Sequence, residues 1–214
     1  MSPAPHDSDR SDGPEVVDDP AAEDDPVAEG DPELVEARRA GDDPALEDDP
    51  VAEDASVRYP DGSTGDLELI RHSGASAIVP VLGDLADPDP EILLLRQFRY
   101  AAGCAVYEIP AGRPDRRGEP WEDVARRELE EETGYTAHRL RRLTTIYTTP
   151  GFTDERIHLF LATGLTRGTT NLDDDEFVEV VPMKLSAVLD AVDDGRIIDG
   201  KSLCALLFYA TLVR

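Results

Sequence analysis

The stretch Tyr107–Tyr135, YEIPAGRPDRRGEPWEDVARRELEEETGY, carries a dense group of acidic residues. Its second half has the pattern of a helix. Pro120 suits the first turn of this helix, and Gly134 is a helix-stopping residue at its other end. The first half contains a short apolar run followed by the tight Pro110-Ala111-Gly112 turn. The stretch therefore predicts a strand, a turn, a loop and a helix, in that order.

Four glutamates stand close together in the helix. Successive residues of an α-helix are turned by about 100°, so Glu128, Glu131 and Glu132 share one face. Glu130 points elsewhere. Three carboxylates on one turn repel one another, and a hard divalent cation would offset this repulsion. Oxygen ligands without Cys or His nearby favour Mg²⁺ or Mn²⁺ over Zn²⁺, and such ions serve phosphoryl chemistry. The alternative is a solvated acidic face with arginine partners.

Acidic residues dominate the composition. The chain has 214 residues and a formal net charge of −26, and residues 1–55 hold 20 of the acidic residues against 3 arginines. Such a charge argues against binding to nucleic acid or to anionic membrane surfaces. Lysine occurs only at Lys184 and Lys201, against 19 arginines. This composition suits a high-salt cytoplasm, although a GC-rich genome gives a similar bias.

The sequence has no features of export, membrane insertion or a disulfide framework. The N-terminus lacks the apolar core of a signal peptide. The longest apolar run, Leu203–Val213, is too short to span a bilayer. Cys104 and Cys204 both sit in apolar settings, so we expect ordinary buried thiols. These observations predict a cytoplasmic protein.

The chain divides into three parts by composition. Residues 1–32 contain almost no large apolar side chains, which predicts a disordered acidic tail. The segment DDPAAEDDPVAE at Asp18–Glu29 recurs as DDPALEDDPVAE at Asp42–Glu53, and local duplication accounts for it. Residues 33–73 are expected to form a small N-terminal β segment, and residues 74–214 the main domain.

Apolar runs and turn residues place the elements. We expect strands at Leu34–Ala40, Val51–Tyr59, Leu67–His72, Ala77–Leu82, Glu91–Arg96, Tyr107–Ile109, Leu140–Tyr147, Arg156–Thr163 and Glu179–Met183. Two helices follow the opening one, at Lys184–Val192 and at Lys201–Val213, the last with an apolar face of Leu203, Leu206, Leu207 and Ala210. Strands and helices alternate, which predicts a mixed α/β layered fold around one sheet.

The opening stretch resembles the signature of the Nudix hydrolase family. Arg127–Tyr135, RELEEETGY, matches REUxEExGU, in which U is a bulky apolar or aromatic residue. Glu119 stands eight residues before Arg127, as the signature expects, whereas six residues separate Gly112 from Glu119 where the signature has five. The resemblance implies a Nudix-type α/β/α sandwich with a mixed sheet.

Further segments look like the ADP-ribose pyrophosphatase branch of this family. They are Leu95–Tyr100, Tyr107–Gly112, Pro150–Glu155 and Gly195–Leu203, and a proline at the position of Pro150 marks the branch. The resemblance runs from about residue 33 to the C-terminus. It implies a homodimer with exchanged N-terminal strands, so that residues 33–73 would be a dimerisation arm that helps to bind the adenosine end of the substrate.

The resemblance also implies a metal site. Glu128 and Glu132, together with the carbonyl of Ala111, would hold Mg²⁺, and Glu131 would join them or hold a catalytic water. Arg127 would pair with Glu119 or Glu131 and orient the helix, which is a structural role.

Residues outside the helix complete the predicted site. Glu155, on the loop after Pro150, is expected to be the general base for the attacking water, with Asp154 as the alternative because neighbouring loop carboxylates cannot be separated from sequence. Arg99 and Glu108 are expected to bind substrate. Arg99 is equally suited to gripping a phosphate bidentately and to forming a surface salt bridge. Phe152 is suited to stacking on a sugar or base, or to anchoring its loop.

Two more aromatic side chains are expected to be structural. His158 alternates with apolar strand residues, which favours a core histidine whose hydrogen bonds are satisfied. Trp121 on the helix is expected to pack rather than to bind ligand.

These features predict a Mg²⁺-dependent pyrophosphatase, with Mn²⁺ as an alternative metal, that cleaves ADP-ribose to AMP and ribose 5-phosphate. One alternative is hydrolysis of another nucleoside diphosphate derivative, such as a nucleotide sugar or NADH. A non-catalytic ADP-ribose sensor is a further alternative, which the intact glutamates and the lack of a basic patch disfavour. The expected partners are the substrate and a second copy of the chain, without nucleic acid or membrane.

Overall fold

The computed structural model describes residues 33–39, 50–168 and 178–213. The tail predicted over residues 1–32, most of the second acidic repeat and the acidic loop at 173–176 lie outside the described residues.

The elements follow the predicted order, with adjusted bounds. The strands are β1 Glu33–Arg39, β2 Val51–Arg58, β3 Thr64–Arg71, β4 Ala75–Leu82, β5 Glu91–Arg99, β6 Cys104–Glu108, β7 Ala111–Gly112, β8 Tyr135–Tyr147, β9 Arg156–Arg167 and β10 Val178–Lys184. The helices are α1 Trp121–Thr133, α2 Leu185–Asp193 and α3 Gly200–Phe208, and a π-helical segment, Tyr209–Val213, continues α3. None of these described helices combines the length and the hydrophobicity that crossing a membrane requires.

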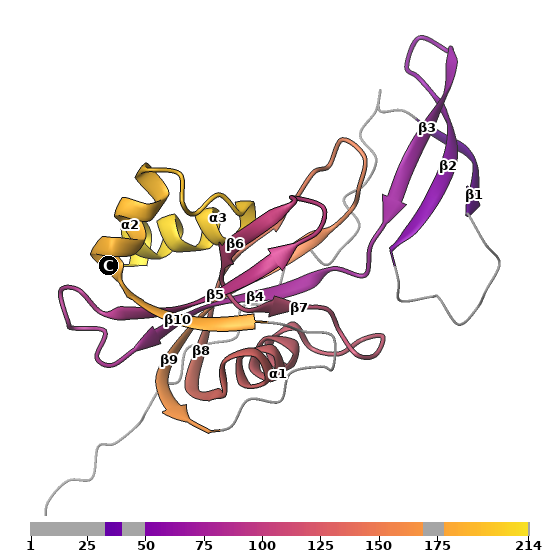
Figure 1. Ribbon diagram of the computed structural model, residues 1–214. Coiled ribbons are helices and arrows are strands. Elements are labelled where there is room, and N and C mark those ends of the chain that lie inside the picture. The colour runs from indigo at the N-terminus through magenta and orange to yellow at the C-terminus, as the bar shows by residue number, and fades with distance from the viewer. Residues whose placement is uncertain (1–32, 40–49, 169–177, 214) are drawn as a thin grey trace, which may run out of the picture.

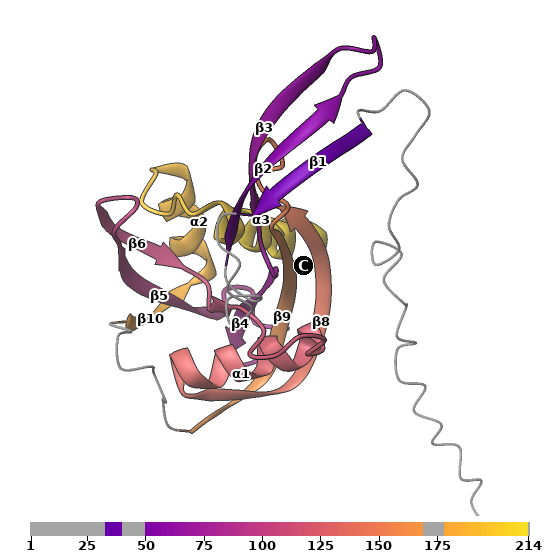
Figure 2. The same cartoon turned by 90° about the vertical axis from the view of Figure 1, so that its right-hand side faces the viewer.

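The main sheet is mixed, as predicted. Its strand order is β10-β5-β4-β9-β8, with β6 paired to β5 and β7 paired to β4. β4 and β9 run parallel, whereas the other pairs of this sheet run antiparallel. Figures 1 and 2 show α1 on one face of the sheet and α2 and α3 on the opposite face. This arrangement is the α/β/α sandwich that the resemblance implied.

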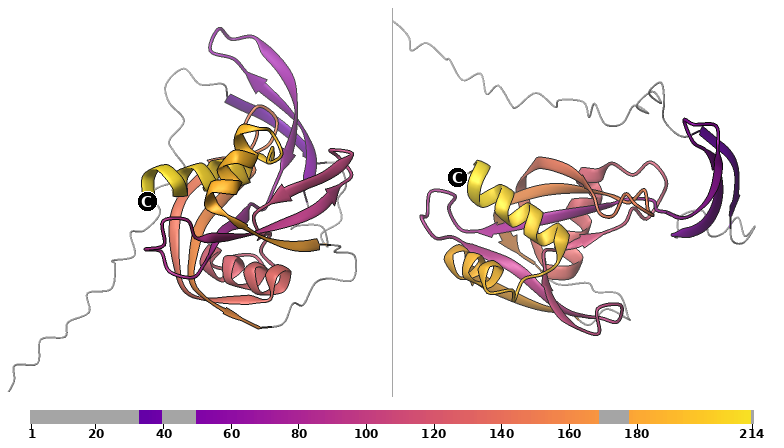
Figure 3. Two further views of the ribbon diagram at one scale, coloured as in Figure 1. Left: turned by 60° about the vertical axis from the view of Figure 1, so that its left-hand side comes forward. Right: turned by 90° about the horizontal axis from the view of Figure 1, so that it is seen from above.

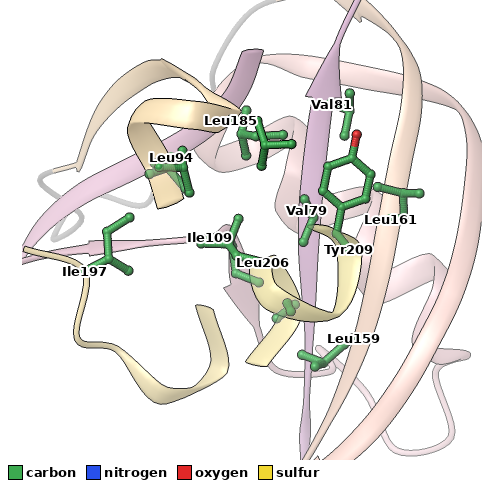
Figure 4. Close-up of a cluster of buried hydrophobic side chains, with 14 of the residues drawn as sticks. Val79, Val81, Leu94, Ile109, Leu159, Leu161, Leu185, Ile197, Leu206 and Tyr209 are labelled. Atoms are coloured by element: carbon green, nitrogen blue, oxygen red, sulfur yellow. The ribbon is translucent and has the colours of Figure 1, made fainter. Parts of the chain in front are cut away.

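Alternation along β4 builds an apolar core on each face of the sheet. Val79 and Val81 point to the side of α2 and α3, where they meet Leu206 and Tyr209 (Figure 4). Ile78 points to the opposite side and belongs to the cluster under α1. Each fully buried side chain of this kind contributes about 1.5–3 kcal/mol to folding. The two helical layers are therefore held to the same central strand.

The N-terminal strands form a sheet of their own. β1, β2 and β3 pair antiparallel in that order, and the right-hand view of Figure 3 shows this sheet projecting from the sandwich. Its described inward side chains include Ala55 and Val57, which are buried. The end of β3 is bridged to the loop after β8 by a pairing between Ile70 and Thr153.

Three expectations about burial are wrong. Cys104 and Cys204 are both exposed, and Leu207 of the predicted apolar face is 41% exposed. Leu206 and Tyr209 take the core-facing positions of the C-terminal helix, and this phase leaves Cys204 and Leu207 on its outer side. Cys104 begins β6 next to the turn of the β5–β6 hairpin, where the strand is open to solvent.

The Pro110-Ala111-Gly112 segment was expected to be a turn only. In the structure, Ala111 and Gly112 form β7, which pairs with Ala77 and Ser76 of β4. Two residues are too few to show a strand period in sequence, so this element depends on the tertiary fold. Its pairing fixes the backbone that faces the acidic helix.

Candidate active site

The acidic helix is hydrogen-bonded to the sheet at its first turn and ends at a glycine. Ser76 Oγ in β4 donates a hydrogen bond to the carbonyl of Trp121 at 2.8 Å, and Gly134 ends α1 in the left-handed conformation with φ of 72°. Val124 and Leu129 are fully buried beneath α1. Because the apolar residues fix the rotation of the helix, its acidic face turns toward β7, and Glu130 is exposed as predicted.

Two of the predicted metal-binding glutamates lie directly against β7. Glu132 is 4% exposed and Glu128 is 9% exposed. The N–H of Ala111 donates to Glu132 Oε2 at 2.9 Å. A Cβ atom on Gly112 would lie 2.0 Å from Glu128 Oε1. Only a glycine therefore leaves room for this carboxylate beside the β7 backbone.

Arg127 neutralises the crowded carboxylates. Its Nη1 lies 2.8 Å from Glu128 Oε1 and 2.9 Å from Glu131 Oε2. Its Nε lies 3.1 Å from Asp115 Oδ2, whereas Glu119 Oε1 is 3.9 Å away. The predicted pairing with Glu131 is thus confirmed, Glu119 is a more distant ion-pair partner, and Glu119 also accepts the N–H of Asp115 at 2.8 Å. The loop before α1 and the helix are tied together through one guanidinium group.

We call Ala111, Gly112, Glu128, Glu131 and Glu132 the cradle. Across the part of the chain that is described, no three acidic, histidine or cysteine side chains are arranged to hold a metal ion as they stand. The contacts of these side chains explain this, because Glu128 and Glu131 point to Arg127 and Glu132 points to the N–H of Ala111. The donor set still fits a hard divalent cation, since buried carboxylates adjoin a backbone turn with no side chain between them.

Arg99 and Glu108 form an ion pair. Arg99 Nε and Nη2 donate to the two carboxylate oxygens of Glu108 at 2.7 and 2.8 Å. Lys201 Nζ also contacts Glu108 and lies 3.1 Å from Asp199 Oδ2. Glu108 is only 3% exposed, whereas the Arg99 side chain is 46% exposed, so the salt bridge that was considered is present and joins a half-exposed guanidinium group to a buried carboxylate. Two donors of Arg99 are thereby taken by protein.

Glu108 is held in its charged form by this cluster. Burial by itself would raise the pKa of Glu108, but the hydrogen bond from Arg99 and the positive charge of Lys201 outweigh it and hold the pKa below its ordinary value. The hydrogen bond with Glu108 in turn raises the pKa of Arg99. Glu108 and Arg99 therefore keep their charges throughout the neutral range.

The two loop carboxylates have different environments. Asp154 Oδ1 accepts the backbone N–H of His72 at 2.8 Å, and its Oδ2 lies 3.2 Å from Arg71 Nη1. Glu155 Oε2 accepts from Thr148 Oγ1 at 2.7 Å, and its Oε1 lies 3.5 Å from His72 Nε2. Asp154 thus fastens the loop to the end of β3, whereas Glu155 contacts a hydroxyl group and an imidazole ring.

Phe152 lies on the same loop with its ring 48% exposed. The loop is anchored by the backbone of this residue, because its carbonyl accepts the N–H of Ile70 at 2.7 Å. The aromatic side chain itself is not part of the core.

The loop and the cradle flank the same end of β4. Gly112 lies opposite Ser76 on one side of this strand, and Ile157, two residues after Glu155, lies opposite Ala75 on the other side. The topology therefore brings the two groups of carboxylates to the first residues of one strand, although they are far apart in sequence.

The two aromatic residues assigned to packing do pack. His158 is 5% exposed, its Nδ1 lies 3.0 Å from Thr145 Oγ1, and its ring stacks on Trp121 with centroids 4.2 Å apart. The expectation of a core histidine is confirmed.

Sequence reasoning assigned no role to His72, Arg71 or Lys201. Lys201 had one available signal, because it is one of two lysines in the chain. The positions of Arg71 and His72 at the end of a strand carried no local signal, since their partners lie 83 and 82 residues away.

An α/β/α sandwich with an RELEEETGY helix packed on its sheet defines a Nudix-type hydrolase. The family model described as the NUDIX domain matches residues 74–205, and the chain belongs to this family as a Nudix pyrophosphohydrolase. Family members generally use divalent metal ions.

Known proteins resemble this chain over most of its length. An ADP-ribose pyrophosphatase of Bacillus subtilis is 40% identical over 154 residues, which cover 71% of this chain and 80% of that protein. The methanol dehydrogenase activator of Bacillus methanolicus is 36% identical over the same shares of the two chains. A crystal structure of an ADP compounds hydrolase superposes with a TM-score of 0.71 at 19% identity, over 86% of this chain and 94% of that one. These findings confirm the resemblance to the ADP-ribose pyrophosphatase branch.

Replacing Gly112 by alanine should weaken metal binding. The added methyl group would collide with the Glu128 carboxylate, which must then shift from its present position beside β7. We expect the affinity for Mn²⁺, measured by electron paramagnetic resonance titration, to fall by about 10- to 100-fold. Gly200→Ala is the matched control, because a Cβ there meets nothing within 4 Å. Equal Mn²⁺ affinity in both variants would contradict the assignment of the cradle.

Replacing Glu108 by glutamine should make the free energy of unfolding less dependent on pH in the acid range. Because the folded pKa of Glu108 is lowered, its stabilising effect is present above its ordinary pKa of 4.5 and is lost as the pH falls through the folded value. At pH 7 the variant should lose on the order of 3–5 kcal/mol of unfolding free energy, and this deficit should shrink at pH 3 in urea titrations. Glu179→Gln, at an exposed pair with Arg96, is the control. A deficit of equal size at both pH values would refute the argument.

Proposed function

We propose that this protein is a Mg²⁺-dependent hydrolase that splits the pyrophosphate of ADP-ribose into AMP and ribose 5-phosphate. The observation that carries the proposal is the placement of the cradle and of Glu155 on either side of the start of β4. Hydrolysis of a pyrophosphate needs both charge neutralisation at the phosphates and a base for water. The similarity to the Bacillus subtilis ADP-ribose pyrophosphatase supports the choice of substrate.

The cradle would hold the metal. Glu128 and Glu132, with the carbonyl of Ala111, would be the ligands, and Glu131 would join them or orient a bound water. When bound there, Mg²⁺ or alternatively Mn²⁺ neutralises phosphate charge and favours ionisation of water. Arg127 would keep the carboxylates apart and oriented, because it already bonds to Glu128 and Glu131 from one side.

Glu155 would be the general base. Both oxygens of Asp154 are engaged by Arg71 and by the backbone of His72, so Asp154 acts as a structural anchor of the loop. Glu155 receives a hydrogen bond from Thr148 and remains 26% exposed at its side chain. A base must reach the proton of an attacking water. Asp154 is paired with the guanidinium group of Arg71, whereas the contacts of Glu155 are the Thr148 hydroxyl and the His72 imidazole, so Glu155 is the better candidate for this role.

Arg99, Glu108 and Phe152 would contribute to substrate binding. The side chain of Arg99 is 46% exposed even while it pairs with Glu108, so its outer edge can still meet a phosphate. Glu108 would act by fixing the plane of that guanidinium group. The exposed ring of Phe152 suits stacking against a base or a sugar.

The remaining expectations complete the proposal. Residues 33–73 would form a dimerisation arm, residues 74–214 the hydrolase domain and residues 1–32 an acidic tail. The protein would act in the cytoplasm as a homodimer, and its acidity suits a high-salt interior.

A substrate panel should identify ADP-ribose as the preferred substrate. With Mg²⁺ present, we expect kcat/KM for ADP-ribose to exceed the values for nucleotide sugars and for NADH, with AMP and ribose 5-phosphate as products by chromatography. Chelation of the metal should abolish turnover. A higher kcat/KM for another nucleoside diphosphate derivative would reassign the substrate. Binding of ADP-ribose without hydrolysis would favour the sensor.

Exchanging the two loop carboxylates for amides should separate their roles. Glu155→Gln removes the proposed base and should lower kcat by about 10²- to 10⁴-fold, whereas Asp154→Asn should lower it by less than about tenfold. The melting temperature should instead fall more in Asp154→Asn, because its contacts with Arg71 and His72 hold the loop. The reverse order of the two kcat values would make Asp154 the base.

A further inference from the structure

His72 adjoins the proposed base and has a defined orientation. Its side chain is 13% exposed, and its Nε2 lies 3.5 Å from Glu155 Oε1. On the other side of the ring, Nδ1 accepts the backbone N–H of Gly74 at 3.0 Å. We infer that His72 is a positioning residue for Glu155, an inference that rests on the proposed role of Glu155 as base.

The hydrogen bond from Gly74 fixes the tautomer. An imidazole nitrogen that accepts a hydrogen bond carries no proton, so the neutral ring has its proton on the other nitrogen. That nitrogen is Nε2, the one that faces Glu155. His72 therefore presents an N–H donor to the carboxylate. A contact of 3.5 Å can shorten when substrate is bound, since catalytic hydrogen bonds are often long in structures without ligand.

A donor faces each carboxylate oxygen of Glu155. Thr148 Oγ1 donates to Oε2 at 2.7 Å, and His72 faces Oε1. Two donors on different oxygens fix the rotation of a carboxylate about its terminal bond, which a single donor leaves free. Loss of the imidazole donor would let the carboxylate turn about its contact with Thr148. The base would then spend less time in the orientation that accepts a proton from water.

His72 is itself held rigidly, because the end of β3 and the loop form one unit. The N–H of Ile70 donates to the carbonyl of Phe152 at 2.7 Å. Arg71 contacts Asp154 at 3.2 Å and the buried carboxylate of Glu53 at 3.0 Å. These contacts are made by the two residues that precede His72, and the imidazole ring takes no part in them. Its replacement therefore removes one donor to Glu155 and leaves the anchoring contacts in place.

Two substitutions that differ by one methylene group test the inference. His72→Asn can still accept the Gly74 N–H but does not reach Glu155, whereas the longer amide of His72→Gln reaches it. We expect His72→Asn to lower kcat for ADP-ribose by about tenfold with KM changed less than about twofold, and His72→Gln to recover most of the loss. His138→Gln is the control, because His138 is exposed on β8.

A double-mutant cycle separates positioning from packing. If His72 acts through Glu155, adding His72→Asn to Glu155→Gln should lower kcat by less than about twofold further, since coupled residues are not additive. An additive loss, or an equal kcat for His72→Asn and His72→Gln at equal melting temperatures, would overturn the inference. If Glu155→Gln alone keeps wild-type kcat, the proposed base is wrong, and that result is distinct from the failure of His72. A loss of kcat in His72→Asn that follows only a lower melting temperature would assign His72 a structural role and also overturn the inference.

Discussion

The pairing of the first residues of β4 sets the positions of β7, β9 and α1. Ser76 pairs antiparallel with Gly112 of β7 and parallel with His158 of β9, and its hydroxyl bonds to the first turn of α1. Three elements are thereby fixed to one fully buried residue. A polar group buried without a partner would cost about 1–3 kcal/mol, so the satisfied hydroxyl favours this one arrangement. Both halves of the proposed site follow from it.

Arginine compensates the buried acid in both halves of the sandwich. Arg127 contacts Glu128 and Glu131 on α1, and Arg99 holds Glu108 in a two-point contact. A planar guanidinium group matches a carboxylate with two parallel hydrogen bonds, which lysine cannot do. Breaking such a buried pair costs several kcal/mol because it leaves a charge without its partner. The predominance of arginine over lysine therefore has a structural use in this chain, besides its effect on overall composition.

Local patterns in the sequence predicted the elements well, because they depend on short periods. The 3.6-residue period placed Glu128, Glu131 and Glu132 on one face of α1, and apolar runs bounded by turn residues located β4 and β9. The tertiary contacts of these elements were harder to predict from the sequence. β7 is too short to have a period, and the choice between Asp154 and Glu155 depends on contacts with the end of β3. Burial of the cysteines was mispredicted for a similar reason. Apolar neighbours in the sequence do not show which side of a helix faces the core, or whether a strand of a hairpin is exposed to solvent.

The two halves of the proposed site are held by contacts that differ in sequence separation. The cradle is nearly local, because Ala111 and Glu132 are separated by 21 residues. The loop of Glu155 is held by contacts that span 82 and 83 residues and reach into β3 of the N-terminal sheet. Closing a longer loop costs more conformational entropy, and contacts at the edge of a projecting sheet open more readily than those of the core. The orientation of the proposed base therefore depends on the N-terminal sheet, whereas the cradle depends on the sandwich alone. The N-terminal sheet lies outside the NUDIX match, which begins at residue 74, and in this way it supports the proposed catalytic site.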